Sequence, residues 1–93
     1  MGIIYTVLYE QSVIERDIAT VPTNWKQKIK NTISQKLTTN PEVFGKPLRR
    51  SLKGYRRLRV GDYRVVYRIE DQTVKVFAIL HRSIVYKIIE KRI

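Results

Sequence analysis

Arginine side chains lie on both sides of a Gly-Asp pair in the second half of this sequence. Arg57 and Arg59 precede Gly61 and Asp62, and Arg64 follows them. A guanidinium group carries a permanent positive charge and a planar set of donors that suits phosphate oxygens, but it keeps its proton and cannot act as a base. This pattern therefore predicts a site that holds a polyanion.

The elements that must position these arginines are the two strands of a β-hairpin. A two-residue Gly61-Asp62 loop is typical of a type II′ turn, in which glycine supplies the positive φ. Such a loop places Arg59 directly opposite Arg64, and like charges in that position destabilise the strand pair unless an anion is held there. Side chains alternate along a strand, so the hairpin has an apolar face and a basic face. The apolar face holds Leu58, Val60, Tyr63, Val65 and Tyr67, and the arginine face holds Tyr55, Arg57, Arg59, Arg64, Val66 and Arg68.

Positive charge is concentrated in one half of the chain. The net charge is +11, and residues 1–45 contain five Lys or Arg against four Asp or Glu, whereas residues 46–93 contain fourteen against four. A basic region is typical of nucleic-acid binding, although an ordinary basic surface has the same composition. Its confinement to one half, and then to one strand face, favours nucleic-acid binding.

Length and composition exclude several classes of protein. The 93 residues suit one small domain, which we expect to span residues 1–93. No cysteine is present, so disulfides, zinc–thiolate sites and thiol catalysis are excluded. The longest apolar run, 76–80, is too short to span a membrane, and no N-terminal signal pattern is visible. We therefore expect a cytoplasmic protein.

The first half of the chain predicts a strand and then helices. Residues 3–9 are rich in β-branched and aromatic side chains, which favours a strand. Ser12 and Glu15 fit a capping box at the start of a short helix. The spacing of that helix predicts that Ile14 and Ile18 are buried.

A second helix is expected to start at Thr23, which can cap it, and to end at the Asn40-Pro41 pair. Residues 41–52 are expected to form a connection that contains Gly45 and Pro47. The apolar side of the helix holds Trp25, Ile29, Ile33 and Leu37.

The pairing of the last strand follows from a turn at residues 71–72. This turn predicts that Val66 faces Phe77 and that Arg64 faces Ile79. The same register places His81 on the arginine face.

Together these elements predict an α+β domain. It has an antiparallel sheet of about four strands, with the last strand over residues 74–80. An N-terminal helical hairpin lies on one face, and a short C-terminal helix occupies 84–93. In that helix we expect Ile84, Ile88 and one of Val85 and Ile89 to be buried. The opposite face of the sheet would remain open to a partner.

Three stretches resemble the RelE/ParE superfamily of bacterial toxins from toxin–antitoxin pairs. They are Lys46-Pro-Leu48, Leu58-Arg-Val-Gly-Asp-Tyr-Arg-Val-Val-Tyr67 and His81-Arg-Ser-Ile-Val-Tyr86. The layout of elements is similar over nearly the whole chain. RelE-like ribonucleases and ParE-like gyrase inhibitors share this scaffold, so the central block identifies the superfamily better than the branch.

Resemblance to the RelE-like branch implies a ribosome-dependent endoribonuclease that cuts mRNA in the ribosomal A site. In such toxins a ribose 2′-hydroxyl attacks the adjacent phosphate without a metal ion or cofactor. The reaction needs cations around the phosphorus, an acceptor for the hydroxyl proton and a donor to the leaving oxygen. The resemblance assigns catalytic positions to Arg57, Arg64, Arg82 and Tyr86, and Tyr55 stands where the family has a lysine.

Because arginine cannot accept the proton, the acid or base must come from His81, Tyr86 or Lys53. Histidine exchanges protons most readily near neutral pH, which favours His81. A strand-end histidine bonded to backbone explains this residue equally well. Tyr86 is expected to donate a proton or to stack on a base. Further RNA contacts are expected from Lys46, Arg49, Arg50, Lys53, Tyr55, Arg59 and Arg68.

Two other functions remain open from the sequence. One is a ParE-like inhibitor of DNA gyrase, which needs neither His81 nor Tyr86 as a chemical group. The other is a non-enzymatic RNA-binding module. For a toxin, the resemblance implies a cognate antitoxin with an acidic or amphipathic segment, in addition to mRNA and ribosomal RNA. We expect a monomer for the toxin alone and a larger assembly with the antitoxin, with no membrane, metal or cofactor involved.

Overall fold

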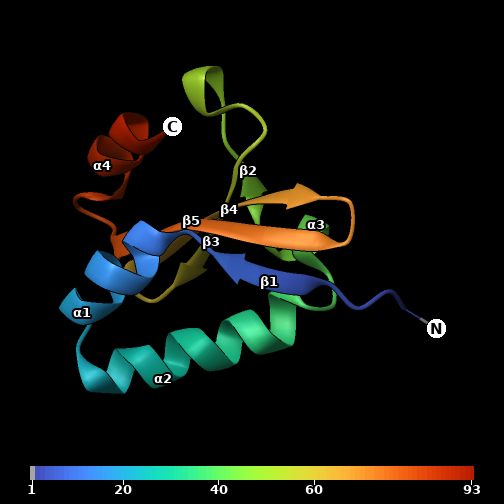
Figure 1. The fold of residues 1–93 in the computed structure, drawn as a ribbon, viewed down its shortest axis with the longest axis horizontal. Coiled ribbons are helices and arrows are strands. Elements are labelled where there is room, and N and C mark those ends of the chain that lie inside the picture. The colour runs from blue at the N-terminus through green and yellow to red at the C-terminus, as the bar shows by residue number, and fades with distance from the viewer. Residues whose placement is uncertain (1) are drawn as a thin grey trace.

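The computed structural model describes residues 2–93, which form a five-stranded sheet with helices on both faces. In spatial order the strands are β1 (Thr6–Tyr9), β5 (Thr73–His81), β4 (Tyr63–Glu70), β3 (Arg56–Val60) and β2 (Lys46–Pro47) (Figure 1). The predicted α+β class is confirmed. Two details of the sheet differ from the prediction, because β1 pairs with β5 in parallel and β2 adds a fifth strand. Within the described residues, no helix has the length and apolar character needed to cross a membrane.

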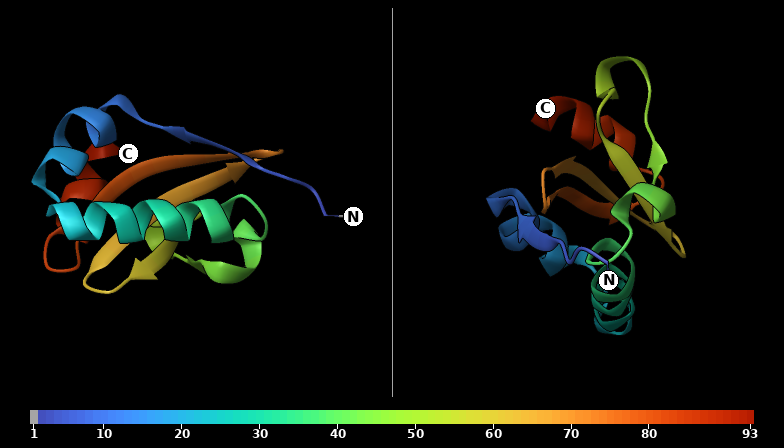
Figure 2. Two further views of the ribbon diagram at one scale, coloured as in Figure 1. Left: turned by 90° about the horizontal axis from the view of Figure 1, so that it is seen from below. Right: turned by 90° about the vertical axis from the view of Figure 1, so that its right-hand side faces the viewer.

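The N-terminal helices cover one face of the sheet. A π-helical turn, η1 (Val13–Asp17), runs into α1 (Ile18–Thr20), and α2 (Thr23–Thr32) continues into η2 (Ile33–Leu37). Figure 2 shows α2 crossing the sheet along its length. The predicted apolar stripe is confirmed. One core cluster holds Ile29, Ile33 and Leu37 from the helices and Leu58, Val60, Val65 and Tyr67 from the hairpin.

The start of the first helix differs from the prediction. Ser12 has helical backbone angles and makes no capping bond, and the Val13 amide donates to the Glu10 carbonyl at 3.0 Å. The helix therefore begins before the predicted cap, and its fully buried positions are Val13 and Asp17. Ile14, predicted to be buried, is 58 % exposed.

The second helix has its cap one residue before the predicted cap, Thr23. Pro22 holds the cap position and Thr23 is the first helical residue. The Pro22 carbonyl accepts bonds from the amides of Trp25 and Lys26, each at 3.0 Å. The Trp25 ring packs on Tyr63 with 5.6 Å between centroids, which confirms its predicted packing role.

The arginine hairpin forms in the predicted register. Arg59 pairs with Arg64, and Gly61 has a φ of +58°. A Cβ atom on Gly61 would lie only 2.1 Å from the Trp25 ring. Glycine is therefore required here both by the turn and by the approach of α2.

A β-bulge changes the pairing of β4 with β5. Tyr67 pairs with Val76, but Val66 pairs with Ala78, so Phe77 has no partner. The predicted pairing of Val66 with Phe77 is therefore wrong.

Beyond the bulge the predicted register is displaced by one residue. Arg64 pairs with Leu80 and not with Ile79, and His81 pairs with Tyr63. The prediction that His81 falls on the arginine face is consequently wrong. The bulge changes which side chains of β5 point to each face of the sheet. The sequence does not reveal this change, because the end of β5 is a continuous apolar run in which every residue is compatible with burial.

The second face of the sheet was predicted to be open to a partner. This prediction is wrong, because α4 (Val85–Arg92) covers part of that face. Figure 1 shows α4 and α2 on opposite sides of the sheet. Val85 and Ile89 of α4 are buried against the sheet, whereas Ile84, predicted to be buried, is exposed. A second core therefore forms from Leu52, Tyr55, Val66, Ala78, Leu80, Val85 and Ile89.

A buried ion pair joins α4 to the first helix. Arg92 donates to both carboxylate oxygens of Asp17, at 2.7 and 2.8 Å, and this bond raises the pKa of the guanidinium. The Ile79 amide donates to Asp17 at 2.9 Å, and Arg92 donates to the Phe77 carbonyl at 3.1 Å. Asp17 and Arg92, which are far apart in the sequence, thus hydrogen-bond the backbone of β5 at Phe77 and Ile79, beyond the residues of β5 that pair with β1.

The stretch predicted as a connection contains α3 (Pro41–Phe44), β2 and η3 (Arg50–Leu52). The Tyr67 hydroxyl donates to the Pro41 carbonyl at 2.5 Å. Gly45 allows this approach, since a Cβ there would lie 1.7 Å from the hydroxyl oxygen. These contacts hold α3 against the sheet.

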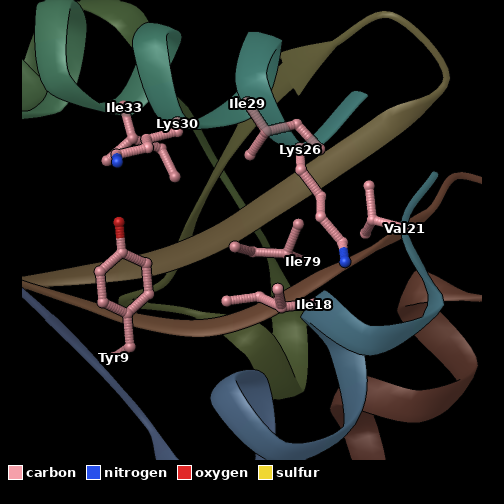
Figure 3. A pocket seen from close by; sticks show the side chains of 8 residues that line it. All are labelled: Tyr9, Ile18, Val21, Lys26, Ile29, Lys30, Ile33 and Ile79. Atoms are coloured by element: carbon pink, nitrogen blue, oxygen red, sulfur yellow. The ribbon is translucent and has the colours of Figure 1, made fainter. Parts of the chain in front are cut away.

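An apolar cavity of about 290 Å³ lies between the N-terminal helices and the sheet (Figure 3). Its walls are mainly aliphatic, with Tyr9, Lys26 and Lys30 as the polar contributors. None of the predicted site residues lines it. The functional candidates lie elsewhere.

Candidate functional site

Two neighbouring hollows share Arg57 and Arg64. The Tyr86 hollow, of about 390 Å³, is lined by Arg57, Arg64, His81, Arg82, Ser83 and Tyr86. The Phe44 hollow, of about 170 Å³, is lined by Phe44, Lys46, Arg57, Arg59 and Arg64. The structure thus brings all five residues predicted as catalytic into the lining of one hollow. Among these described lining residues there is no carboxylate, so both hollows favour anions.

Arg57 and Tyr86 contact each other from different elements. Nη1 of Arg57, on β3, donates to the phenolic oxygen of Tyr86, on α4, at 2.5 Å. The guanidinium carbon lies 6.0 Å from the ring centroid. Because the phenolic oxygen accepts this bond, its own hydrogen remains available to a ligand.

Arg64 is held at the hairpin turn. Its Nη1 donates to the carbonyls of Gly61 and Tyr63, each at 2.9 Å. These bonds orient the guanidinium through one nitrogen and leave Nε and Nη2 for a ligand. An oxyanion between Arg64 and the exposed Arg59 opposite it would relieve the repulsion of the pair.

His81 borders the Tyr86 hollow at the end of β5. Its ring packs edge-on against Tyr63, with 5.6 Å between centroids. Nδ1 accepts the Ser83 amide at 3.2 Å and lies 2.8 Å from the Ser83 hydroxyl. An amide can only donate, so in the neutral ring Nδ1 carries the lone pair and the proton is assigned to Nε2. His81 is thus arranged to donate a hydrogen bond through Nε2.

Arg82 joins the end of β5 to the hairpin turn. Its amide donates to the Asp62 carbonyl at 2.7 Å, and its Nε lies 3.6 Å from the Asp62 carboxylate. Both side chains are exposed, so the ion pair is weak. The guanidinium is free to turn toward a bound anion.

Two of the predicted RNA contacts are engaged in protein contacts. Tyr55, predicted to contact RNA, is only 8 % exposed and packs edge-on against Phe77, so little of its ring is accessible to RNA. The cause is the second core, which covers this end of the arginine face. Arg68 forms an ion pair with Glu70, which raises the pKa of the guanidinium, and donates to the Tyr55 hydroxyl at 3.2 Å.

The other predicted RNA contacts fall into two groups. Lys46 and Arg59 line the Phe44 hollow. The second group is exposed around η3 and lines neither hollow, and Figure 1 shows this yellow-green segment standing off the sheet. It comprises Arg49, Arg50 and Lys53.

Sequence reasoning did not single out Phe44 and Ser83. Phe44 ends α3, two residues before Lys46, in the stretch predicted as a connection. Its proximity to Arg57 depends on the pairing of β2 with β3, in which Lys46 faces Arg57. Ser83 lies two residues after His81, and this short spacing is the sequence feature that could have indicated its contact with the His81 ring.

The sequence matches a known protein family over residues 11–86. The family is described as ParE toxin of the type II toxin–antitoxin system parDE. A toxin named RelE from Mycobacterium tuberculosis is 38 % identical over 77 % of this chain and 76 % of its own length. A toxin named RelG from the same organism is 34 % identical over 89 % of this chain and 97 % of its own length.

Solved structures share the fold. A toxin–antitoxin complex of the RelBE type from Mycobacterium tuberculosis contains a chain that superposes with a TM-score of 0.80 at 34 % identity, covering 87 % of this chain and 94 % of that one. A RelB–RelE complex from Methanococcus jannaschii gives a TM-score of 0.69 at 24 % identity, covering 87 % and 96 %. The second similarity concerns the fold alone.

Proposed function

This chain belongs to the RelE/ParE superfamily of toxins from type II toxin–antitoxin systems, and we propose that it is a ribosome-dependent endoribonuclease that cuts mRNA in the ribosomal A site. The observation that carries the proposal is the Tyr86 hollow. Three arginines, a histidine and a tyrosine surround it without a carboxylate. That set of groups suits a phosphodiester whose charge increases during reaction.

In the proposed reaction the ribose 2′-oxygen attacks the adjacent phosphorus. The new bond from phosphorus to the 2′-oxygen forms while the bond to the 5′-oxygen breaks, leaving a cyclic phosphate and a free 5′-hydroxyl. Arg57, Arg64 and Arg82 stabilise the charge on the phosphoryl oxygens. The 2′-hydroxyl proton passes to an acceptor, and the leaving oxygen takes a proton from a donor.

His81 and Tyr86 are the two groups in this hollow that can exchange those protons. One of the two takes the 2′-hydroxyl proton and the other gives a proton to the leaving oxygen. Because Ser83 occupies Nδ1, Nε2 is the nitrogen of His81 left for this exchange, and the Tyr86 hydroxyl, with Arg57 beside its oxygen, is the second exchanging group. Lys53 lines neither hollow and is the weakest of the three candidates.

The proposed partners follow from the family. The similar solved structures from Mycobacterium tuberculosis and Methanococcus jannaschii are complexes of toxin with antitoxin. We expect a cognate antitoxin for this chain too, and an acidic or amphipathic segment would complement the basic hollows. Cytoplasmic location follows from ribosomal mRNA as the substrate.

Mapping RNA ends on ribosomes after a brief pulse of expression tests the proposal. Cuts in translated mRNA, in register with codons, are the expected result. DNA damage with intact RNA would instead indicate gyrase inhibition, which the ParE description of the matched family keeps as the second candidate. Bound but uncut RNA would indicate a non-enzymatic binding module.

A further inference from the structure

Phe44 presents an aromatic ring among cations. The side chain is 42 % exposed and lines the Phe44 hollow together with Lys46 and three arginines. The amine of Lys36 lies 5.2 Å from the ring centroid. An exposed ring in such surroundings offers a stacking surface next to groups that bind phosphate.

The backbone that carries Phe44 is fixed by hydrogen bonds from the sheet. Tyr67 donates to the Pro41 carbonyl at 2.5 Å. Arg56 donates to the carbonyls of Glu42 and Gly45, at 3.0 and 2.9 Å. Carbonyls before and after Phe44 are thus anchored, so the ring is positioned before any ligand arrives.

We propose that Phe44 is the stacking platform for a nucleobase of the bound RNA, adjacent to the nucleotide in the Tyr86 hollow. This inference rests on the proposed function and names a second subsite of the same site. Arg57 and Arg64 line both hollows, so a phosphate held by them lies between two nucleotides. One nucleotide then faces Tyr86 and the other faces Phe44.

Physical precedent supports a nucleobase as the occupant. Proteins bind single-stranded nucleic acid by combining a basic groove along the backbone with aromatic rings on which bases stack. The Phe44 hollow has both parts, and its described lining contains no acidic group that would repel phosphate. Val43 is more exposed than Phe44, at 75 %, yet lines neither hollow, which makes it a matched control.

The test measures binding to ribosomes programmed with an mRNA whose A-site codon carries 2′-deoxyribose, which prevents cleavage by removing the attacking group. Each codon position is made abasic in turn. Four proteins are compared, namely the wild type, Phe44→Ala, Phe44→Trp and Val43→Ala. Phe44→Leu replaces Phe44→Ala should the latter unfold, because it keeps apolar bulk without an aromatic face.

Loss of the ring is expected to weaken binding of intact mRNA roughly 10- to 100-fold. Removing the base at one codon position should abolish the difference in affinity between the wild type and Phe44→Ala. Removing the base at either of the other positions should leave that difference unchanged. Phe44→Trp and Val43→Ala should bind like the wild type.

Three results would overturn the inference. In the first, Phe44→Ala binds like the wild type while the wild type still cuts mRNA, and the proposed function then survives. In the second, Phe44→Ala binds mRNA more weakly than the wild type by the same factor whichever codon position is abasic, or it weakens binding of the antitoxin alone. In the third, the wild type neither binds nor cuts mRNA, which overturns the proposed function as well.

Discussion

At the scale of single residues, Arg64 occupies a position that destabilises the hairpin but favours the binding of phosphate. It lies opposite Arg59 in the ladder and lines both hollows. Arg64→Ala should lower the rate of cleavage about 10²- to 10³-fold, the effect of losing one donor to a transition-state oxyanion. Relief of the like-charge pair, about 0.2–1 kcal/mol, should offset the lost bonds to the turn, so the protein should still fold. Cleavage on programmed ribosomes and thermal unfolding are measured on one preparation.

Arg16→Ala is the matched control for Arg64→Ala. It removes the same charge from an exposed position on η1, outside both hollows. Wild-type cleavage by Arg64→Ala, or its failure to fold, would contradict the role of this arginine as a phosphate clamp.

Conservative variants can separate the roles proposed for His81 and Tyr86 in proton transfer. His81→Gln and Tyr86→Phe should each slow cleavage about 10²- to 10⁴-fold, the usual contribution of a positioned acid or base. Tyr86→Phe keeps the ring on α4, so its thermal unfolding should match the wild type. Single-turnover rates on programmed ribosomes measure both. An unchanged rate in His81→Gln, with a lost rate in Tyr86→Phe, would leave His81 as a strand-end residue bonded to Ser83.

At the scale of elements, the Asp17–Arg92 pair joins the first helix to the C-terminal end of α4, the helix that carries Tyr86. Asp17 is 1 % exposed and Arg92 has no other carboxylate among its described contacts. Asp17→Asn should lower the free energy of unfolding by up to about 3–5 kcal/mol, because it leaves the partly buried Arg92 cation without its carboxylate. Equilibrium unfolding in urea measures the change, and cleavage should fall with it.

Glu10→Gln provides the comparison for Asp17→Asn. Glu10 pairs with Lys75 at 3.0 Å, and both side chains are more than a third exposed. Breaking this pair should change the free energy of unfolding by at most about 1 kcal/mol. Equal losses in the two variants would show that the buried pair does not hold α4.

The packing of α3 against the sheet should depend on alkaline pH through Tyr67. Burial raises the pKa of Tyr67 to about 12, whereas a tyrosine in an unfolded chain ionises near pH ~10. Between these values the unfolded chain releases a proton that the folded chain keeps. The contribution is therefore fully present below about pH 10 and is lost as the pH rises to about 12, by roughly 2–3 kcal/mol in total.

Tyr67→Phe isolates that effect. The variant should lose the hydroxyl bond to Pro41 at every pH, and its free energy of unfolding should fall less steeply between about pH 10 and 12. Urea unfolding at a series of pH values measures both slopes. Parallel slopes would contradict the assignment to Tyr67.

At the scale of the whole molecule, the concentration of positive charge in one half of the chain should govern the proposed association with RNA. Residues 46–93 hold fourteen of the nineteen Lys and Arg residues. Binding to single-stranded RNA should weaken with salt, with a slope of log affinity against log salt of about −0.7 for each phosphate neutralised. Arg64→Ala should reduce the slope by about one such step. A flat affinity from low to physiological salt would argue against a phosphate-binding surface.

The α+β class and the arginine hairpin could be predicted because their determinants are local, whereas Arg82 and Tyr86 were singled out by the family resemblance. Gly61-Asp62 sets the turn, alternation sets the faces, and a two-residue loop sets the register of Arg59 with Arg64. The same reasoning failed past Phe77. The bulge there coincides with bonds from Asp17 and Arg92, which come from the two ends of the chain.

The order of residues is enough to predict the sign and location of the charge, the hairpin and the arginines able to bind phosphate. The closure of part of the arginine face by α4, the burial of Tyr55 and the position of Phe44 beside Arg57 became visible in the folded molecule. Turn chemistry and side-chain alternation act between neighbours along the chain, so they are visible in the order of residues. Burial and proximity depend on which distant segments meet, and that is settled by packing of the whole molecule.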